Sequence, residues 1–189
     1  MTKGKLIVVS APSGCGKSTI INTILDTRDF DLSFSVSATN RPPRAGEEDG
    51  VHYHFLSTER FRDAVENGEF VEWEEVYPGR YYGTLRSEID LQLAKGHNVI
   101  LDIDVKGALN VKRLYGGDCV TIFIEPPSID TLRQRLESRG TDPQDVIETR
   151  LARAEYEISF AGEFDTRVVN DKLDEAVAQT AGIIEEFIA

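Results

Sequence analysis

The sequence predicts an α/β fold, in which a parallel sheet is flanked by helices and carries a smaller, strand-rich lobe. Two observations support this prediction. Along most of the chain, short apolar runs typical of buried strands alternate with segments of helical periodicity, as in βαβ units. Between residues 34 and 84, apolar and polar residues instead alternate one by one, which is typical of strands with one face in water.

The core elements follow one another in a regular order. Buried strands are predicted at residues 6–9, 98–104, 120–124 and 167–170. Helices are predicted at residues 19–25, 107–115, 128–138, 143–160 and 173–188. A further helix is expected to begin at Thr84 or Ser87 and to end near Lys95. Ser128 is the expected cap of one helix, and Pro143 suits the first position of the next.

Alternating segments are predicted at residues 32–37, 51–55 and 70–77, and the inserted lobe is predicted to span residues 34–84. A short helix at residues 58–67, capped by Ser57 or Thr58, precedes the last of these segments. Residues 38–50 form a polar loop rich in arginine, proline, glycine and glutamate. We expect Trp73 to pack in the core.

The first strand is followed by a glycine-rich turn. The segment from Ser10 to Thr19 reads SAPSGCGKST and meets the pattern G-x-x-x-x-G-K-[ST], except that Ala11 stands at the first glycine. Such glycines let backbone N–H groups point inward, and the helix that follows adds the positive end of its dipole, so the turn can hold phosphate oxygens. Lys17 can reach the terminal phosphates of a nucleoside triphosphate, and the Ser18 hydroxyl can bind Mg²⁺. The alternative is a chance GKS sequence, but the flanking strand and helix favour a P-loop NTPase-type sheet.

Composition limits the function classes. The chain has 189 residues, which suits one globular unit, and its net charge of −12 disfavours nucleic acid and anionic membranes as partners. We expect no membrane span, because no apolar run approaches the ~18–20 residues required, and no signal peptide, because the N-terminus leads straight into a strand. Cys15 and Cys119 provide no disulfide framework, so we expect a cytoplasmic protein in which Cys15 only fills space between two glycines.

Charged side chains elsewhere suggest a phosphoryl-transfer site. Asp102 ends a buried strand and can support Mg²⁺, although it could instead cap the next turn. Arg41 and Arg44 flank two prolines and can clamp a phosphate monoester, although a solvated basic loop is the alternative. Arg139 and Arg150 would neutralise the transferring phosphoryl group from a closing lid, and taken alone they fit surface ion pairs equally well.

Six sequence blocks together resemble the guanylate kinase family. They read SAPSGCGKST, SFSVSATNRPPRAGE, FVEWEEV with YYGT, ILDIDVKGA, RLESRGTD and VVND, and they span nearly the whole chain. The resemblance implies an enzyme that moves the γ-phosphoryl group of ATP to GMP, and also to dGMP, by in-line transfer with Mg²⁺. It implies one domain, residues 1–189, with a core at 1–33, 85–138 and 155–189, a GMP-binding lobe at 34–84 and a helical lid at 139–154.

The resemblance also assigns residues to the site. The ATP-binding residues it implies are Ala11, Pro12, Ser13, Gly14, Cys15, Gly16, Lys17, Ser18, Thr19 and Asn170. The GMP-binding residues it implies are Ser37, Arg41, Arg44, Tyr53, Glu72, Tyr82, Thr84 and Asp104. Catalytic roles are implied for Lys17, Arg41, Arg139 and Arg150, and Mg²⁺ binding for Ser18 and Asp102.

The chemistry of guanine agrees with this base-facing set. Guanine presents N1–H and an exocyclic amine on one edge, and a carboxylate such as that of Glu72 or Asp104 can accept both hydrogen bonds. Adenine offers an acceptor there, which would leave a buried carboxylate unpaired at a cost of about 1–3 kcal/mol. The residues alone do not distinguish Glu72 from Glu74 and Glu75; the resemblance does.

Two other functions stay open from the sequence. A sugar-phosphate kinase of the same fold would keep the phosphate turn but should lack the set of Tyr53, Glu72 and Tyr82. A non-catalytic module, as in guanylate-kinase-like domains of scaffold proteins, would tend to lose the turn in which Lys17 is present here. One departure from the family is Asn40, in a segment where Ser and Thr are more usual. We expect a monomer or small homo-oligomer whose partners are ATP and GMP.

Overall fold

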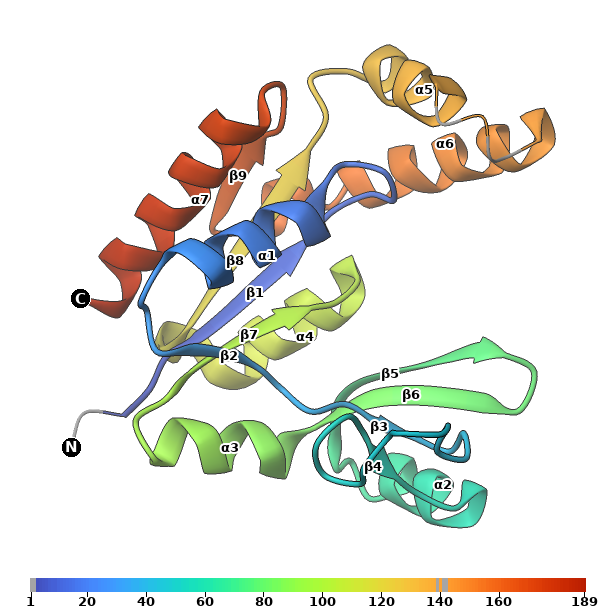
Figure 1. Ribbon diagram of the computed structural model, residues 1–189, viewed down its shortest axis with the longest axis vertical. Coiled ribbons are helices and arrows are strands. Elements are labelled where there is room, and N and C mark those ends of the chain that lie inside the picture. The colour runs from blue at the N-terminus through green and yellow to red at the C-terminus, as the bar shows by residue number, and fades with distance from the viewer. Residues whose placement is uncertain (1–2, 139, 141–142) are drawn as a thin grey trace.

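The computed structural model describes residues 3–138, 140 and 143–189. Within these residues, a parallel sheet of five strands in the order β2-β7-β1-β8-β9 forms the centre of the molecule (Figure 1). The strands are β1 (Leu6–Ser10), β2 (Leu32–Phe34), β7 (Asn98–Asp102), β8 (Cys119–Glu125) and β9 (Thr166–Val169). β1 lies in the middle of the sheet and is buried along its whole length. Residues 11–19, which we call the phosphate loop, follow β1 directly and therefore lie at the centre of the carboxyl edge of the sheet.

Helices cover both faces of this sheet. Alternation along β1 sends Leu6 and Val8 into one apolar cluster and Ile7 and Val9 into the other. The first cluster includes residues of α3 (Arg86–Ala94) and α4 (Val105–Tyr115), and the second includes residues of α1 (Lys17–Thr27) and α7 (Leu173–Ile188). The continuous apolar run of β1 is therefore explained by burial on both sides.

A second sheet forms the lobe, with the order β4-β3-β6-β5 in the described part of the chain. Its strands are β3 (Ala38–Thr39), β4 (His54–Phe55), β5 (Phe70–Tyr77) and β6 (Arg80–Leu85). α2 (Thr58–Glu66) packs Phe61 and Ala64 against Ala38 and Phe70 of this sheet. The Ser57 hydroxyl caps α2 by accepting a hydrogen bond of 3.1 Å from the backbone N–H of Arg60, as predicted.

An arm is formed by α5 (Ile129–Ser138) and α6 (Gln144–Ile158). Leu132 and Leu136 of α5 pack with Ile147 and Leu151 of α6 and with Cys15 of the phosphate loop. In Figure 1 the arm and the second sheet both extend from the end of the parallel sheet at which β1 leads into α1. Two short 3₁₀ helices, η1 (Gly116–Asp118) and η2 (Ala161–Glu163), precede β8 and β9.

The predicted α/β class is confirmed, whereas several details of the lobe differ from prediction. Thr84 does not begin a helix: it lies in β6, and α3 begins at Arg86. Trp73 is not in the core: its side chain is 47% exposed, and it lies on β5, which pairs only with β6 in the described structure. Residues 51–52 form a turn rather than part of a strand.

Two strands were not predicted at all. β3 is only two residues long and lies within the expected polar loop. β6 follows β5 through a tight turn at Pro78 and Gly79, and it is held chiefly by its pairing with β5 rather than by a hydrophobic pattern of its own. Among the described helices, none combines the length and the apolar character that crossing a membrane requires.

Candidate active site

A cavity of about 1030 Å³ opens beside the carboxyl ends of β1 and β7. Its wall combines the phosphate loop, residues of both sheets and one side of α6. The predicted site residues found in this wall are Ala11 to Thr19, Ser37, Tyr53, Glu72, Tyr82, Thr84, Asp102, Asp104 and Arg150. Folding therefore brings together most of the residues that the sequence assigned to two different nucleotides.

The phosphate loop has the backbone that its glycines predict. Gly14 and Gly16 have φ angles of 91° and 81°, in the left-handed region that other residues adopt only with strain. Gly16 is the N-cap of α1 and supplies no side chain to bond the first turn. N–H groups at the start of α1 are therefore available to an anion, in addition to the positive end of the helix dipole.

Asn170 supports this loop from behind. Its side chain is buried, and the amide nitrogen Nδ2 donates a hydrogen bond of 2.8 Å to the carbonyl oxygen of Cys15. Its backbone carbonyl in turn accepts a hydrogen bond of 2.8 Å from Nη1 of Arg135 on α5. The structure thus gives Asn170 a contact with the loop backbone, and its predicted place near adenine stays a prediction.

Lys17, the first residue of α1, forms an ion pair with Asp102, the last residue of β7. The register of the sheet sets Asp102 opposite Val9, so the carboxylate lies where β1 runs into the phosphate loop. The side chains of Lys17 and Asp102 are 19% and 30% exposed, which leaves both partly open to the cavity.

The same corner of the cavity offers oxygen ligands suited to Mg²⁺. The Ser18 hydroxyl and the Asp102 carboxylate are both hard oxygen donors, which Mg²⁺ prefers. No group of three or more His, Cys, Asp or Glu side chains in the described residues could hold a metal ion by itself. These residues therefore fit an ion that arrives with nucleotide phosphates and keeps several waters, as Mg²⁺ usually does.

Two carboxylates, from Glu72 and Asp104, meet on the lobe side of the cavity. Glu72 and Thr84 are direct cross-strand partners on β5 and β6, and the Thr84 hydroxyl donates a hydrogen bond of 2.5 Å to Oε1 of Glu72. Asp104 is the N-cap of α4, and its Oδ1 accepts a hydrogen bond of 2.7 Å from the N–H of Gly107.

Gly107 allows these two carboxylates to approach each other. A Cβ at this position would lie 3.0 Å from Cβ of Glu72 and 3.2 Å from Oδ1 of Asp104, so a side chain would push them apart. Burial raises the pKa of Glu72 above its usual 4.5, the nearby negative charges of Asp104 and Glu74 raise it further, and the hydrogen bond from Thr84 opposes the shift. An acceptor pair of this kind is suited to a ligand edge with two donors.

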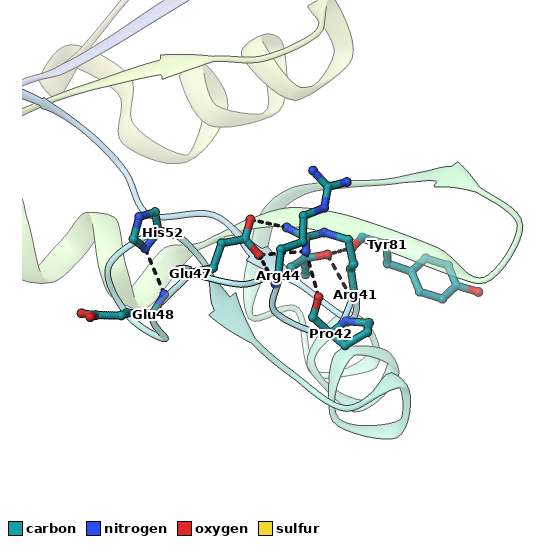
Figure 2. A network of polar contacts seen from close by, with 8 residues as sticks. Arg41, Pro42, Arg44, Glu47, Glu48, His52 and Tyr81 are labelled. Atoms are coloured by element: carbon teal, nitrogen blue, oxygen red, sulfur yellow. Dashed lines mark hydrogen bonds and ion pairs between the residues drawn. The ribbon is translucent and has the colours of Figure 1, made fainter.

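Arg41 and Arg44 lie in the loop between β3 and β4, next to the wall rather than in it. The centre of the Arg41 guanidinium lies 5.4 Å from the centre of the Tyr53 ring, and the Tyr53 and Tyr82 rings are 5.9 Å apart. In Figure 2 the Glu47 carboxylate faces the Arg41 guanidinium, and both of its oxygens accept hydrogen bonds from Arg41. Glu47 was missed by the sequence analysis, because a glutamate in a polar loop carries no signal of its own.

The side of α6 contributes three charged residues to the wall. Arg150, Arg153 and Glu157 follow one another at spacings of three and four residues, which places them on one face of the helix. Of these three residues, only Arg150 was predicted. The helical spacing from Arg150 could have indicated that Arg153 and Glu157 lie on the same face of the helix. Nε of Arg153 lies 3.1 Å from Oε1 of Glu157, and this hydrogen bond raises the pKa of Arg153. The predicted catalytic Arg139 lies outside the described residues.

Comparison with known sequences agrees with this geometry. The family model described as "Guanylate kinase" matches residues 3–187 of this chain. A guanylate kinase of Bacteroides thetaiotaomicron is 56% identical over 98% of this chain and 90% of the relative. A guanylate kinase of Salinibacter ruber is 49% identical over the full length of both proteins.

Solved structures give the same result. A crystal structure of guanylate kinase from Anaplasma phagocytophilum matches with a TM-score of 0.71 and 31% identity, over all of this chain and 88% of that one. A gluconokinase from Sinorhizobium meliloti matches with a TM-score of 0.51 at 18% identity, which indicates a shared fold alone. The extent of the family match and the identity to its members show that the chain belongs to the guanylate kinase family.

Proposed function

We infer that this chain catalyses the transfer of the γ-phosphoryl group of ATP to GMP, which yields ADP and GDP, as its family implies. The observation that carries the inference is one cavity in which a complete phosphate loop with Lys17 shares a wall with the carboxylates of Glu72 and Asp104. The phosphate loop suits the triphosphate of ATP, the phosphoryl donor. The two carboxylates suit the guanine base of GMP, the phosphoryl acceptor, because they accept hydrogen bonds.

We propose that ATP occupies the phosphate-loop side. The backbone N–H groups of residues 11–19 would hold its phosphate oxygens, and Lys17 would move from Asp102 to the terminal phosphates. Asn170 would lie near the adenine, and its hydrogen bond to the Cys15 carbonyl would keep the loop in place at the same time.

GMP is proposed to occupy the lobe side. Glu72 and Asp104 would accept hydrogen bonds from N1–H and the exocyclic amine of guanine, while the Ser37 and Thr84 hydroxyls adapt as donor or acceptor. Arg41, Arg44, Tyr53 and Tyr82 would hold the phosphate, which is the nucleophile of the reaction. dGMP lacks only the ribose 2′-hydroxyl, which none of these contacts uses, so we propose that it is also a substrate.

Charge neutralisation is the main chemical task of the protein. Attack by a phosphate oxygen needs positioning and cations rather than a strong base, so Lys17, Arg41, Arg139 and Arg150 are the proposed catalytic residues. Mg²⁺, with Ser18 and Asp102 as its proposed protein ligands, would supply further neutralisation of the phosphate charge. The proposed moving parts are the GMP-binding lobe, residues 34–84, and the lid, residues 139–154.

We also propose a location, a class of partner and an assembly state for this protein. Cys15 and Cys119 are buried as thiols, which supports a reducing, cytoplasmic location. The net charge of −12 supports small nucleotides rather than nucleic acid or membranes as partners. A monomer or small homo-oligomer remains our proposal for the assembly.

The test is a coupled assay of ADP release with GMP, dGMP, AMP, CMP and UMP as acceptors. We expect turnover with GMP and dGMP and little with the other three. Turnover with AMP as fast as with GMP would disprove the guanine assignment, and ATP-dependent turnover with none of them would favour a non-catalytic module.

A further inference from the structure

We propose that Glu47 is a positioning residue for this reaction: it holds one edge of the Arg41 guanidinium so that the other edge faces the phosphate of GMP. The inference rests on the proposed function, in which Arg41 binds that phosphate. It concerns a residue outside both nucleotide-binding sets, and it is carried by the hydrogen bonds of the loop between β3 and β4 (Figure 2).

The Glu47 carboxylate binds two parts of this loop at once. Its Oε2 accepts a hydrogen bond of 2.9 Å from Nη1 of Arg41, and its Oε1 accepts one of 2.8 Å from Nη2. Oε2 also accepts a hydrogen bond of 2.6 Å from the backbone N–H of Arg44, while the N–H of Glu47 donates to the Arg44 carbonyl at 3.0 Å. One side chain therefore fixes both the guanidinium of Arg41 and the backbone of Arg44.

Counting donors shows which edge of Arg41 is left for a ligand. A guanidinium has five N–H donors, and Glu47 takes one from each Nη. The Pro42 carbonyl accepts a third, from Nη1 at 2.8 Å. The donors that remain are Nε–H and the second proton of Nη2, which lie on the same side of the planar group. Together they form a fork that matches two oxygens of a phosphate.

Nε of Arg41 supports this reading independently. It is buried and makes no hydrogen bond within 3.5 Å in the described residues, which is unusual for a strong donor; Tyr82 lies near enough to add to the effect of Glu47 in raising the pKa of Arg41. The Arg41 and Glu47 side chains are only 13% and 18% exposed, so water does not compete freely for these donors. A phosphate oxygen bound at this edge would satisfy the unpaired Nε–H.

The surroundings limit rotation of the guanidinium to another edge. Its centre lies 5.4 Å from the Tyr53 ring centre and 5.8 Å from that of Phe55. The hydrogen bonds from Arg41 and from the Arg44 backbone lower the pKa of Glu47 to about 2, so its carboxylate stays charged at neutral pH. Both groups therefore keep their charges at neutral pH, and the two hydrogen bonds orient Arg41 before the phosphate binds.

Glu47→Gln tests the proposal, because the amide keeps the shape but replaces one acceptor oxygen with a donor that faces the N–H groups of Arg41. We expect the dissociation constant of GMP, measured by titration calorimetry, to rise about 10- to 100-fold. Affinity for guanosine, which lacks the phosphate, and the KM for ATP should change less than about twofold. Glu48→Gln is the matched control, because the Glu48 carboxylate makes no hydrogen bond or ion pair with Arg41 in the described residues; this variant should change GMP affinity less than about twofold.

A double-mutant cycle with Arg41→Ala separates the possible outcomes. If Glu47 acts through Arg41, adding Glu47→Gln to Arg41→Ala should change GMP affinity less than about twofold further. An unchanged GMP affinity in Glu47→Gln, additive losses in the double mutant, or equal losses of GMP and guanosine would overturn the proposal. If Arg41→Ala itself binds GMP normally, the proposed phosphate site fails instead, and Glu47 loses its role with it. Should Glu47→Gln fold poorly, Glu47→Asp keeps the charge but shortens the reach, and it should show the same selective loss of GMP over guanosine.

Discussion

The ammonium group of Lys17 is paired with the carboxylate of Asp102, across the point where β1 leaves the sheet. The pair joins the phosphate loop to the strand that carries the proposed Mg²⁺ ligand. Both groups have other partners when a nucleotide binds in the proposed way: a phosphate for Lys17 and the hydrated metal ion for Asp102. In the proposed site, this ion pair would hold both side chains in place until the nucleotide phosphates and the hydrated metal ion become their partners.

Lys17→Ala should reduce kcat/KM for ATP by about 100-fold or more, because it removes a cation that interacts with the charge of the transferring group. The measurement is the coupled ADP-release assay at saturating GMP. Affinity for GMP should remain, since Lys17 lies on the opposite side of the cavity from Glu72. Lys172→Ala is the control, because that lysine is exposed and pairs only with Glu175 on the surface in the described structure. Retention of most of the activity in Lys17→Ala would contradict the proposed donor site.

How well the sequence predicted this site depended on whether each signal was local. The strand, the glycine turn and the helix of the phosphate loop were predicted, because they are contiguous and each has a distinct pattern; the helix begins two residues earlier than expected, and phosphate binding by the loop stays a prediction. Ser57 was predicted as a cap for the same reason, since the cap and the bonded N–H lie three residues apart.

Features that depend on pairing between distant segments could not be predicted. Thr84 or Ser87 was expected to begin a helix, whereas Thr84 lies in β6 opposite Glu72 as a result of the β5–β6 pairing. Trp73 is a residue type common in cores, but it is exposed on an edge strand. The edge position of β5 is known only from the strand order, which the sequence does not show. Glu47 binds Arg41 through a loop conformation that has no sequence pattern.

Glu72→Gln should weaken GMP binding about 10- to 100-fold and leave ATP binding unchanged. The amide offers one acceptor and one donor where guanine presents two donors, so one hydrogen bond is lost and a donor faces a donor. Titration calorimetry with GMP and, separately, with ATP measures both effects. Glu75→Gln is the matched control, because Glu75 lies on the same strand but on its other face, and is exposed. Unchanged GMP affinity in Glu72→Gln would remove this residue from the site.

Binding of the guanine base should weaken as the pH falls. Burial raises the pKa of Glu72, so this carboxylate takes up a proton at a higher pH than an ordinary glutamate, and the protonated form loses acceptor capacity. Affinity should therefore be full at neutral pH and decline as the pH falls toward this raised pKa. Glu47 does not contribute to this decline, because its pKa of about 2 keeps it charged throughout.

Guanosine is the ligand for this pH titration, because the phosphate of GMP has its own pKa near 6 and would obscure the result. Calorimetry from pH 7.5 down to about pH 5 compares the parent protein with Glu72→Gln, whose side chain does not titrate. The parent should lose affinity for guanosine over this range, whereas the already weaker affinity of the variant should stay flat. Parallel curves for the two proteins would show that another group controls the pH dependence.

Gly16→Ala should weaken ATP binding, whereas a glycine-to-alanine change with similar backbone strain elsewhere in the chain should not. The backbone of Gly16 is left-handed, with φ of 81°, and a Cβ there would lie 2.6 Å from Nδ2 of Asn170. The methyl group would displace the amide that bonds the Cys15 carbonyl, and with it the support of the phosphate loop. Gly68→Ala is the matched control: its φ of 65° imposes a similar backbone strain, but a Cβ there meets no atom within 4 Å. Both variants should lose about 1–2 kcal/mol of unfolding free energy to backbone strain in a denaturant titration, Gly16→Ala should lose about 1–3 kcal/mol more through the broken buried hydrogen bond, and only Gly16→Ala should also lose ATP affinity. If the two variants bound ATP equally well, the contact between Asn170 and the loop would have no part in forming the donor site.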